Sequence, residues 1–269
     1  MCEPYNEIIE PMFNQAEQVA SEGEIESARV QYSAIIDFIE RRDEPNLNDK
    51  AIALKRLADC QRELQRKEEA IESHKKALEI YRAIDNPEGG INSLNDVGSL
   101  YEDDGNYSES IAQYEQALAM ALENNLREME AMIRNNIGYV LMLSGKDEEA
   151  LGALQKALDI SRGTGQKRLE AITLSNIAML YKAWRLLDKA KERFEEASKL
   201  NQEIANVDGE LEDCLGIGSV CYQLNEFEQS KKALQRAFAL CEKSKTSERG
   251  PEIEAFLGKI ESEAHSMTA

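Results

Sequence analysis

The sequence predicts an all-α fold made of stacked helix-turn-helix hairpins. Apolar residues recur at spacings of three and four, which is the period of an amphipathic helix. The same pattern of small and bulky residues returns every 40 residues from Ala51 to Gly250. The 269 residues include only 5 Pro and 15 Gly, fewer than a turn-rich β protein needs.

Small residues mark the places where helices are expected to touch. Five consecutive blocks align without a gap, and their eighth position is always small: Ala58, Gly98, Gly138, Ala178 and Gly218. The twentieth position is Ala or Ser. The twenty-seventh is alanine in every block: Ala77, Ala117, Ala157, Ala197 and Ala237. A large side chain at these positions would push two crossing helices apart, so the columns predict close helix contacts.

The blocks divide the chain into repeats. The five full blocks follow one another at 51–90, 91–130, 131–170, 171–210 and 211–250. Each is split into two helices by a turn signal such as Asp104-Gly105-Asn106. A degenerate first copy spans about 9–48, and its junction with the next block holds two extra residues. Pro251 is expected to open a single capping helix over 251–266, so that residues 1–269 form one domain.

The columns resemble those of the tetratricopeptide repeat, which has small residues at positions 8, 20 and 27 and often an aromatic at 11 and 24. Tyr101 and Tyr181 stand at position 11, and Tyr114 and Phe194 stand at position 24. The resemblance covers roughly residues 5–265 and implies a right-handed α-solenoid of about six hairpins. No block has Trp at position 4. The period exceeds the roughly 34 residues usual for this repeat, so the longer repeats of kinesin light chain and of bacterial peptide-pheromone receptors are more similar.

In that family the first helix of each hairpin lines a concave groove with positions 2, 5, 6, 9 and 12. The resemblance therefore implies a partner-binding set: Lys55, Arg56, Arg62, Asn92, Asn95, Ser99, Met132, Asn135, Asn136, Tyr139, Asn176, Met179 and Lys182. Asparagines recur in three successive repeats and could pair with the backbone of an extended peptide, because an amide both donates and accepts. The alternative is that these amides bridge adjacent helices or meet water.

Charge disfavours one class of partner and suggests another. The chain has 32 Lys+Arg against 51 Asp+Glu, a net charge of −19, which disfavours nucleic-acid binding. Residues 50–67 are the exception, with an excess of four positive charges. This stretch could receive an acidic segment or a peptide C-terminus, or it could be an ordinary solvated helix. Asp59 and Asp96 stand where carboxylate-clamp repeats need Asn, so that mode of binding is not expected.

Catalytic and metal motifs are absent from the sequence: it contains no HExxH, P-loop, GxSxG or EF-hand loop, and no cofactor is expected. His74, at position 24, is expected to pack in the core. Five cysteines without a CxxC motif argue for reduced thiols. No leader and no apolar run of membrane-spanning length are visible, so we expect a cytoplasmic protein without membrane insertion.

These observations predict a non-enzymatic module that holds a peptide or helical segment of a partner protein in its concave groove. Two alternatives remain. The protein could be a scaffold or homo-oligomer that associates through convex or terminal surfaces. It could also be a regulatory peptide sensor that acts through a separate effector.

Overall fold

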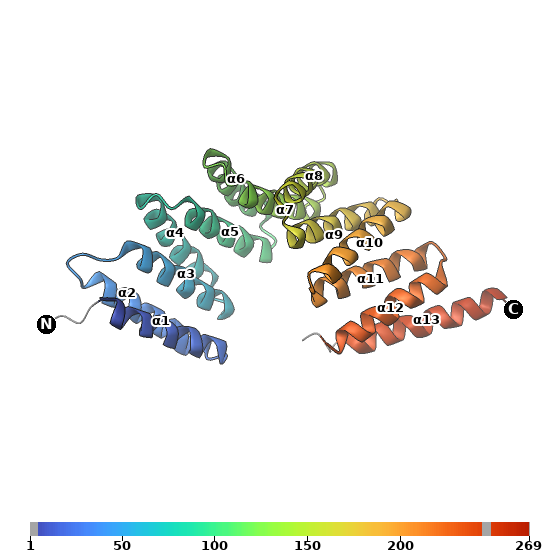
Figure 1. Ribbon diagram of the computed structural model, residues 1–269, viewed down its shortest axis with the longest axis horizontal. Coiled ribbons are helices and arrows are strands. Elements are labelled where there is room, and N and C mark those ends of the chain that lie inside the picture. The colour runs from blue at the N-terminus through green and yellow to red at the C-terminus, as the bar shows by residue number, and fades with distance from the viewer. Residues whose placement is uncertain (1–4, 244–248, 269) are drawn as a thin grey trace. The chain divides into compact units, whose positions relative to one another are not determined.

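The computed structural model describes residues 5–243 and 249–268, with the side chains of 261 and 264–268 excepted. Every element in these residues is a helix, and successive helices are joined by turns into hairpins (Figure 1). The chain divides into two compact units, Met1–Met129 and Glu130–Ala269. The predicted all-α hairpin fold is confirmed within each unit.

Unit 1 contains three hairpins whose helices pack in chain order. Their bounds are α1 Tyr5–Ser21, α2 Ile25–Glu40, α3 Leu47–Glu63, α4 Lys67–Ala83, α5 Pro87–Asp103 and α6 Tyr107–Glu123. Each helix packs on the next. The longer junction expected after the first hairpin is the segment 41–46 between α2 and α3. The other turns of the unit have three residues, so the hairpins follow one another closely.

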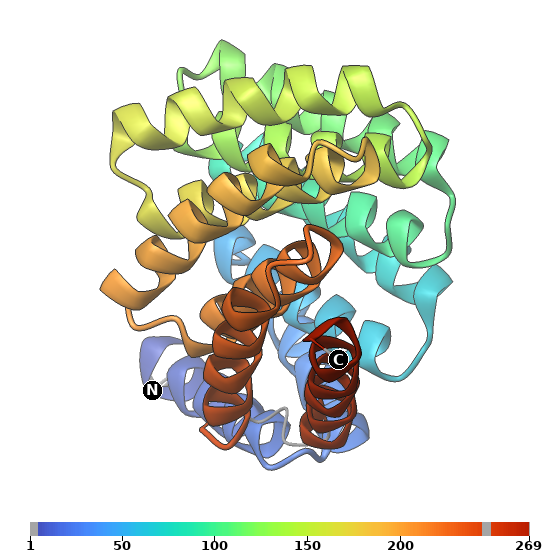
Figure 2. The same cartoon turned by 90° about the vertical axis from the view of Figure 1, so that its right-hand side faces the viewer.

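Unit 2 begins within α7 and ends on a single helix. The bounds are α7 Arg127–Leu143, α8 Asp147–Thr164, α9 Lys167–Ala183, α10 Leu187–Glu203, α11 Val207–Gln223, α12 Phe227–Cys241 and α13 Gly250–Thr268. The helices from α8 onward pack consecutively. Figure 2 shows α13, in dark red, at the C-terminal end of this succession. It packs on α12.

The small residues at positions 8 and 27 of the repeat lie where helices cross, as predicted. A Cβ added to Gly98 would lie 2.5 Å from the ring of Tyr114, and one added to Gly138 would lie 2.6 Å from Leu154 Cγ. Positions 8 and 24 of one hairpin therefore pack against each other. The alanines of position 27 are fully buried in all five blocks: Ala77, Ala117, Ala157, Ala197 and Ala237.

The same backbone conformation recurs in successive turns, two of which occur in each repeat. Nine of them place a residue in the left-handed region, with φ between 54° and 75°: Gln65, Asp85, Gly105, Asn125, Gly145, Gly165, Arg185, Ala205 and Asn225. In the first of these turns the Arg66 N–H donates to the Gln61 carbonyl over 2.8 Å, which satisfies the helix end. Every such turn therefore reverses the chain in the same way.

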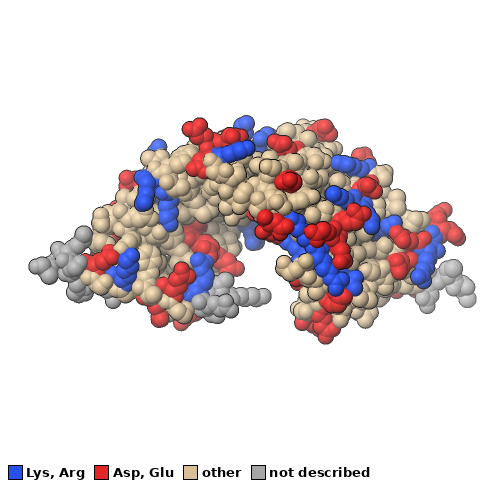
Figure 3. Space-filling model, turned by 180° about the vertical axis from the view of Figure 1, so that it is seen from behind, with Lys and Arg blue, Asp and Glu red and all other residues tan. Residues whose placement is uncertain are grey.

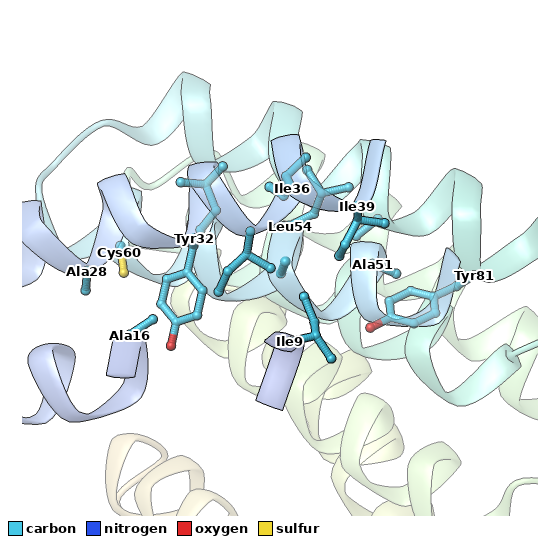
Figure 4. Close-up of a cluster of buried hydrophobic side chains, with 14 residues drawn as sticks. Ile9, Ala16, Ala28, Tyr32, Ile36, Ile39, Ala51, Leu54, Cys60 and Tyr81 are labelled. Atoms are coloured by element: carbon cyan, nitrogen blue, oxygen red, sulfur yellow. The ribbon is translucent and has the colours of Figure 1, made fainter. Parts of the chain in front are cut away.

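The core of unit 1 is built mainly from isoleucine, alanine and tyrosine side chains of α1 to α4. Ile35 and Ile39 of α2 are fully buried and Tyr32 nearly so, and Figure 4 shows Tyr32 and Ile39 beside Leu54 of α3. The described cysteines are free thiols in buried positions, whereas Cys2 lies outside the described residues. None of the described helices is long and apolar enough to cross a membrane.

Candidate functional site

In unit 1, the predicted cations of α3 pair with carboxylates of α5. Lys55 Nζ lies 3.0 Å from Asp96, and Arg62 Nη2 lies 2.6 Å from Asp103. Arg62 also donates to Ser99 Oγ over 3.0 Å. Since the partners come from the next hairpin, these contacts join adjacent repeats. Carboxylates of unit 1 therefore neutralise both Lys55 and Arg62.

The other cations of the basic stretch 50–67 are paired as well. Arg56 lies 3.4 Å from Glu17 of α1, and Arg66 lies 3.3 Å from Glu26 of α2. Figure 3 shows basic and acidic side chains intermixed on the face in view. Exposed pairs of this kind contribute about 0–1 kcal/mol each. Their main effect here is to cancel the local excess of positive charge that the sequence alone displays.

Beside Lys55, three side chains with metal-ligating atoms meet. The ligating atoms of Asp59, His74 and Asp96 lie within 4.8 Å of one another. His74 of α4 is 2% exposed, and among the described residues its Nδ1 has no hydrogen-bond partner. Burial lowers the pKa of His74 and raises that of Asp59. One imidazole and two carboxylates could hold a divalent cation, and the Lys55 ammonium supplies a positive charge beside Asp96. The three side chains come from α3, α4 and α5.

The predicted asparagines are partly used inside the protein. Asn135 of α7 and Asn176 of α9 are 5% and 7% exposed, and Asn176 Nδ2 donates to Asn135 Oδ1 over 3.0 Å. Thr173 Oγ1 donates to the same oxygen over 3.1 Å, and Asn135 Nδ2 donates to Asn136 over 3.3 Å. These amides bridge neighbouring repeats, which is the second of the two interpretations given above.

A pocket of about 700 Å³ in unit 2 is lined by residues of α9, α10, α11 and α13, together with Arg249. It brings together three of the predicted residues, Asn176, Met179 and Lys182. Its wall is mainly apolar and includes Ile172 of α9 and Phe256 of α13. Pockets of this size that combine apolar walls with a few polar groups are typical ligand sites.

A buried carboxylate lies on the wall of this pocket. Asp213 of α11 accepts hydrogen bonds from Ser175 Oγ at 2.6 Å and from Asn201 Nδ2 at 2.8 Å. Burial raises the pKa of Asp213 to about 6, although both hydrogen bonds act to lower it. The three side chains come from α9, α10 and α11, so the carboxylate joins three of the helices that line the pocket.

The remaining predicted residues lie elsewhere. Asn92, Asn95 and Ser99 are half-buried on α5 in unit 1. Met132 and Tyr139 are half-buried on α7 and are not among the residues that line the unit 2 pocket. The predicted set is thus distributed over both units, and the pocket collects only its members on α9.

Sequence reasoning missed the contribution of α13 to the pocket. It gave α13 a capping role, whereas Ile253 and Phe256 also face the pocket. The signal was present in the spacing of Ile253, Phe256 and Ile260, which places apolar residues on one face of the helix. Asp213 gave no such signal, because its burial depends on partners in two other helices.

Comparison with known proteins settles the family. A family model described as tetratricopeptide repeat matches residues 8–83, 51–123 and 129–203, and a second with the same description matches 214–244. The chain belongs to the tetratricopeptide repeat family. No curated protein matches it.

Several solved structures share the tetratricopeptide repeat fold with this chain. BtubC from P. vanneervenii is 20% identical, with a TM-score of 0.72 over 80% of this chain and 90% of that one. Kinesin light chain TPR-like repeats from Podosopora anserina are 15% identical, with a TM-score of 0.61 over 76% and 99%. The quorum sensor NprR from B. thuringiensis is 15% identical, with a TM-score of 0.69 over 96% and 70%. At these identities the likeness concerns the fold.

The predicted resemblance to kinesin light chain-like repeat arrays is therefore confirmed at the level of fold. Tetratricopeptide repeats generally act as protein-interaction modules without catalysis of their own, and the matched residues consist of such repeats. The family thus suggests an interaction module, and the geometry of unit 2 bears on where a partner would bind.

Proposed function

We propose that this tetratricopeptide repeat protein binds a peptide or helical segment of a partner protein in the unit 2 pocket. The observation behind the proposal is the exposure of two large apolar side chains, Ile172 at 40% and Met179 at 37%, beside a pocket of about 700 Å³. Apolar side chains gathered at a concavity mark binding sites, whereas isolated ones are ordinary surface. The segment is therefore expected to present apolar side chains to this wall.

Polar groups at the pocket would orient the segment. Ser219 and Lys182 line it, and Asn176 lies on the same helix as Met179. Because Asn135 and Asn176 are bonded to each other, we assign most of the affinity to apolar contacts rather than to a row of amides along a peptide backbone. A preformed surface on packed helices keeps the ordering cost of binding low on the protein side.

A random-peptide library displayed on phage, panned against the full chain, tests this proposal. Selected peptides are expected to bind Met179→Glu at least about tenfold more weakly, because a carboxylate in an apolar wall must be desolvated. Leu122→Glu is the matched control, since Leu122 is an exposed leucine of α6 in unit 1. Affinities unchanged in Met179→Glu would contradict the proposal.

Light scattering over a concentration range separates the self-association alternative from groove binding. A concentration-dependent oligomer in a protein that selects no peptides would favour the scaffold or homo-oligomer. A protein whose mass does not change with concentration, and which selects peptides sensitive to Met179→Glu, would favour the pocket.

A further inference from the structure

Three side chains form a charge-balanced trio in unit 1. Arg62 of α3 donates to Ser99 Oγ over 3.0 Å and pairs with Asp103 at 2.6 Å, both on α5. In the adjoining turn, the left-handed residue is the uncharged Gln65. One cation therefore meets one carboxylate at the end of these two first helices.

The same trio recurs in unit 2 three repeats later, with its carboxylate replaced. Lys182 of α9 stands in the place of Arg62 and donates to Ser219 Oγ over 2.8 Å, as Arg62 does to Ser99. The position of Asp103 is taken by Gln223, which is neutral. The position of the left-handed glutamine is taken by Arg185, whose Nη1 donates to Gln223 Oε1 over 2.8 Å.

The substitutions leave two cations without a counter-charge. In the part of the chain that the structure describes, neither Lys182 nor Arg185 forms an ion pair; each contacts a neutral side chain of the next repeat. Burial lowers the pKa of Lys182. Other lysines of the unit do have partners, such as Lys167, which lies 3.0 Å from Glu203.

The two cations share a hollow that adjoins the unit 2 pocket. A hollow of about 440 Å³ is lined by Met179, Lys182, Ala183, Arg185 and Gln223, and it shares Met179 and Lys182 with the larger pocket. A segment lying along Met179 would therefore reach both cations at its end.

We propose that Lys182 and Arg185 form an anion subsite that receives a carboxylate of the bound segment. The inference rests on the proposed function of the pocket. Asp103 in unit 1 supports it, because a carboxylate occupies the equivalent place there and bonds the equivalent cation. The carboxylate is an Asp or Glu side chain or a peptide C-terminus, since both offer the same paired oxygens to Lys and Arg.

The subsite is tested with the selected peptides synthesised in three forms: unchanged, with a C-terminal amide, and with Asp and Glu replaced by Asn and Gln. One neutral form is expected to bind the wild-type protein about tenfold more weakly, and which form weakens identifies the source of the carboxylate. The double variant K182Q/R185Q is expected to bind all forms equally. Lys167→Gln, which removes a paired cation, is the control and should retain the preference.

A second measurement needs no peptide. Gln223→Asp restores the unit 1 arrangement and is expected to raise the pKa of Lys182, followed by NMR of its Cε, because the new carboxylate stabilises the ammonium. An unchanged Lys182 pKa in this variant would overturn the subsite.

The two proposals fail in distinguishable ways. Peptides that need Met179 but bind equally well in charged and neutral forms would overturn the subsite and leave the pocket intact. Peptides that bind Met179→Glu as tightly as the wild-type protein would overturn the proposed pocket. The Lys182 pKa in Gln223→Asp would still decide whether the cations accept a carboxylate.

Discussion

Asn176 Nδ2 donates to Asn135 Oδ1 over 3.0 Å, and both side chains are buried. The two residues belong to first helices of successive hairpins, α9 and α7. One hydrogen bond therefore joins their amides across a repeat boundary, at positions where the family resemblance places ligand contacts. The same residue type at the same position can thus hold the solenoid together instead of holding a peptide.

Asn176→Ala is expected to lower the free energy of unfolding by about 1–2 kcal/mol, because it removes a buried hydrogen bond and leaves space behind. Urea denaturation measures the loss. Asn92→Ala is the control, since Asn92 is half-buried on α5 and its side chain forms no hydrogen bond with another described residue, and its effect should stay within about 0.5 kcal/mol. Equal effects of the two variants would show that the bridge adds no stability.

Asp213→Asn is expected to stabilise the protein above pH 6 and to flatten its pH dependence. The pKa of Asp213 is about 6 in the fold, against 3.8 as its ordinary value. Between these values the folded protein binds more protons than the unfolded chain, so the free energy of unfolding falls as pH rises through this window. The loss is on the order of 2–3 kcal/mol.

Thermal unfolding of wild type and Asp213→Asn from pH 4 to pH 8 checks this sign. The asparagine can still accept from Asn201 and can donate to the Ser175 hydroxyl, so the hydrogen bonds are retained. Parallel pH profiles for the two proteins would be incompatible with a buried titrating carboxylate at this position.

Gly98→Ala should destabilise unit 1 by about 1–3 kcal/mol, since its Cβ would lie 2.5 Å from the ring of Tyr114 and would overpack the crossing. Gly152→Ala makes the same change at an exposed site of α8, where an added Cβ would meet no described atom within 4 Å apart from its chain neighbours and the nearby backbone of its own helix. It should stabilise by about 1 kcal/mol through helix propensity. Chemical denaturation of both variants tests the pair; a shift of the same sign in each would refute the packing argument.

Ala205→Gly is expected to stabilise the protein by about 1 kcal/mol. Ala205 has φ of 54° in the turn before α11, a conformation that costs an L-residue with a Cβ and costs glycine little. Ala112→Gly, at an exposed site inside α6, should instead cost about 1 kcal/mol. Melting temperatures should move in opposite directions, and a lower value for both would reject strain at residue 205.

The sequence was sufficient for the fold because backbone constraints repeat. Gly98, Ala178 and Gly218 are small because each stands where two helices cross, and the repeated pattern shows this within a single sequence. Side-chain partners were not predicted, because they lie about one repeat away: Lys55 is 41 residues from Asp96. Counting charges along residues 50–67 gave a basic surface, whereas the acids that neutralise it stand on other helices.

The candidate site was predictable only in part. Met179 and Lys182 were placed by the repeat position of α9, and the pocket contains both. Its far wall depends on how α13 docks, which the 40-residue period does not specify because α13 lies after the last full block. The absence of a counter-charge at Lys182 became visible only by comparison with Arg62, once each cation's neighbours were known.

The ion pairs of unit 1 restrict which hairpins can be neighbours, although the turns between the hairpins share one backbone conformation. Excising residues 87–126 would join two equivalent turns and preserve the backbone geometry. Lys55 would then meet Asn136 in place of Asp96, and Arg62 would meet Leu143 in place of Asp103. A chain that gains or loses a hairpin by recombination must therefore also substitute the charged residues on either side of the new junction. Repeat number can change in one genetic event, whereas compatibility between neighbours takes several.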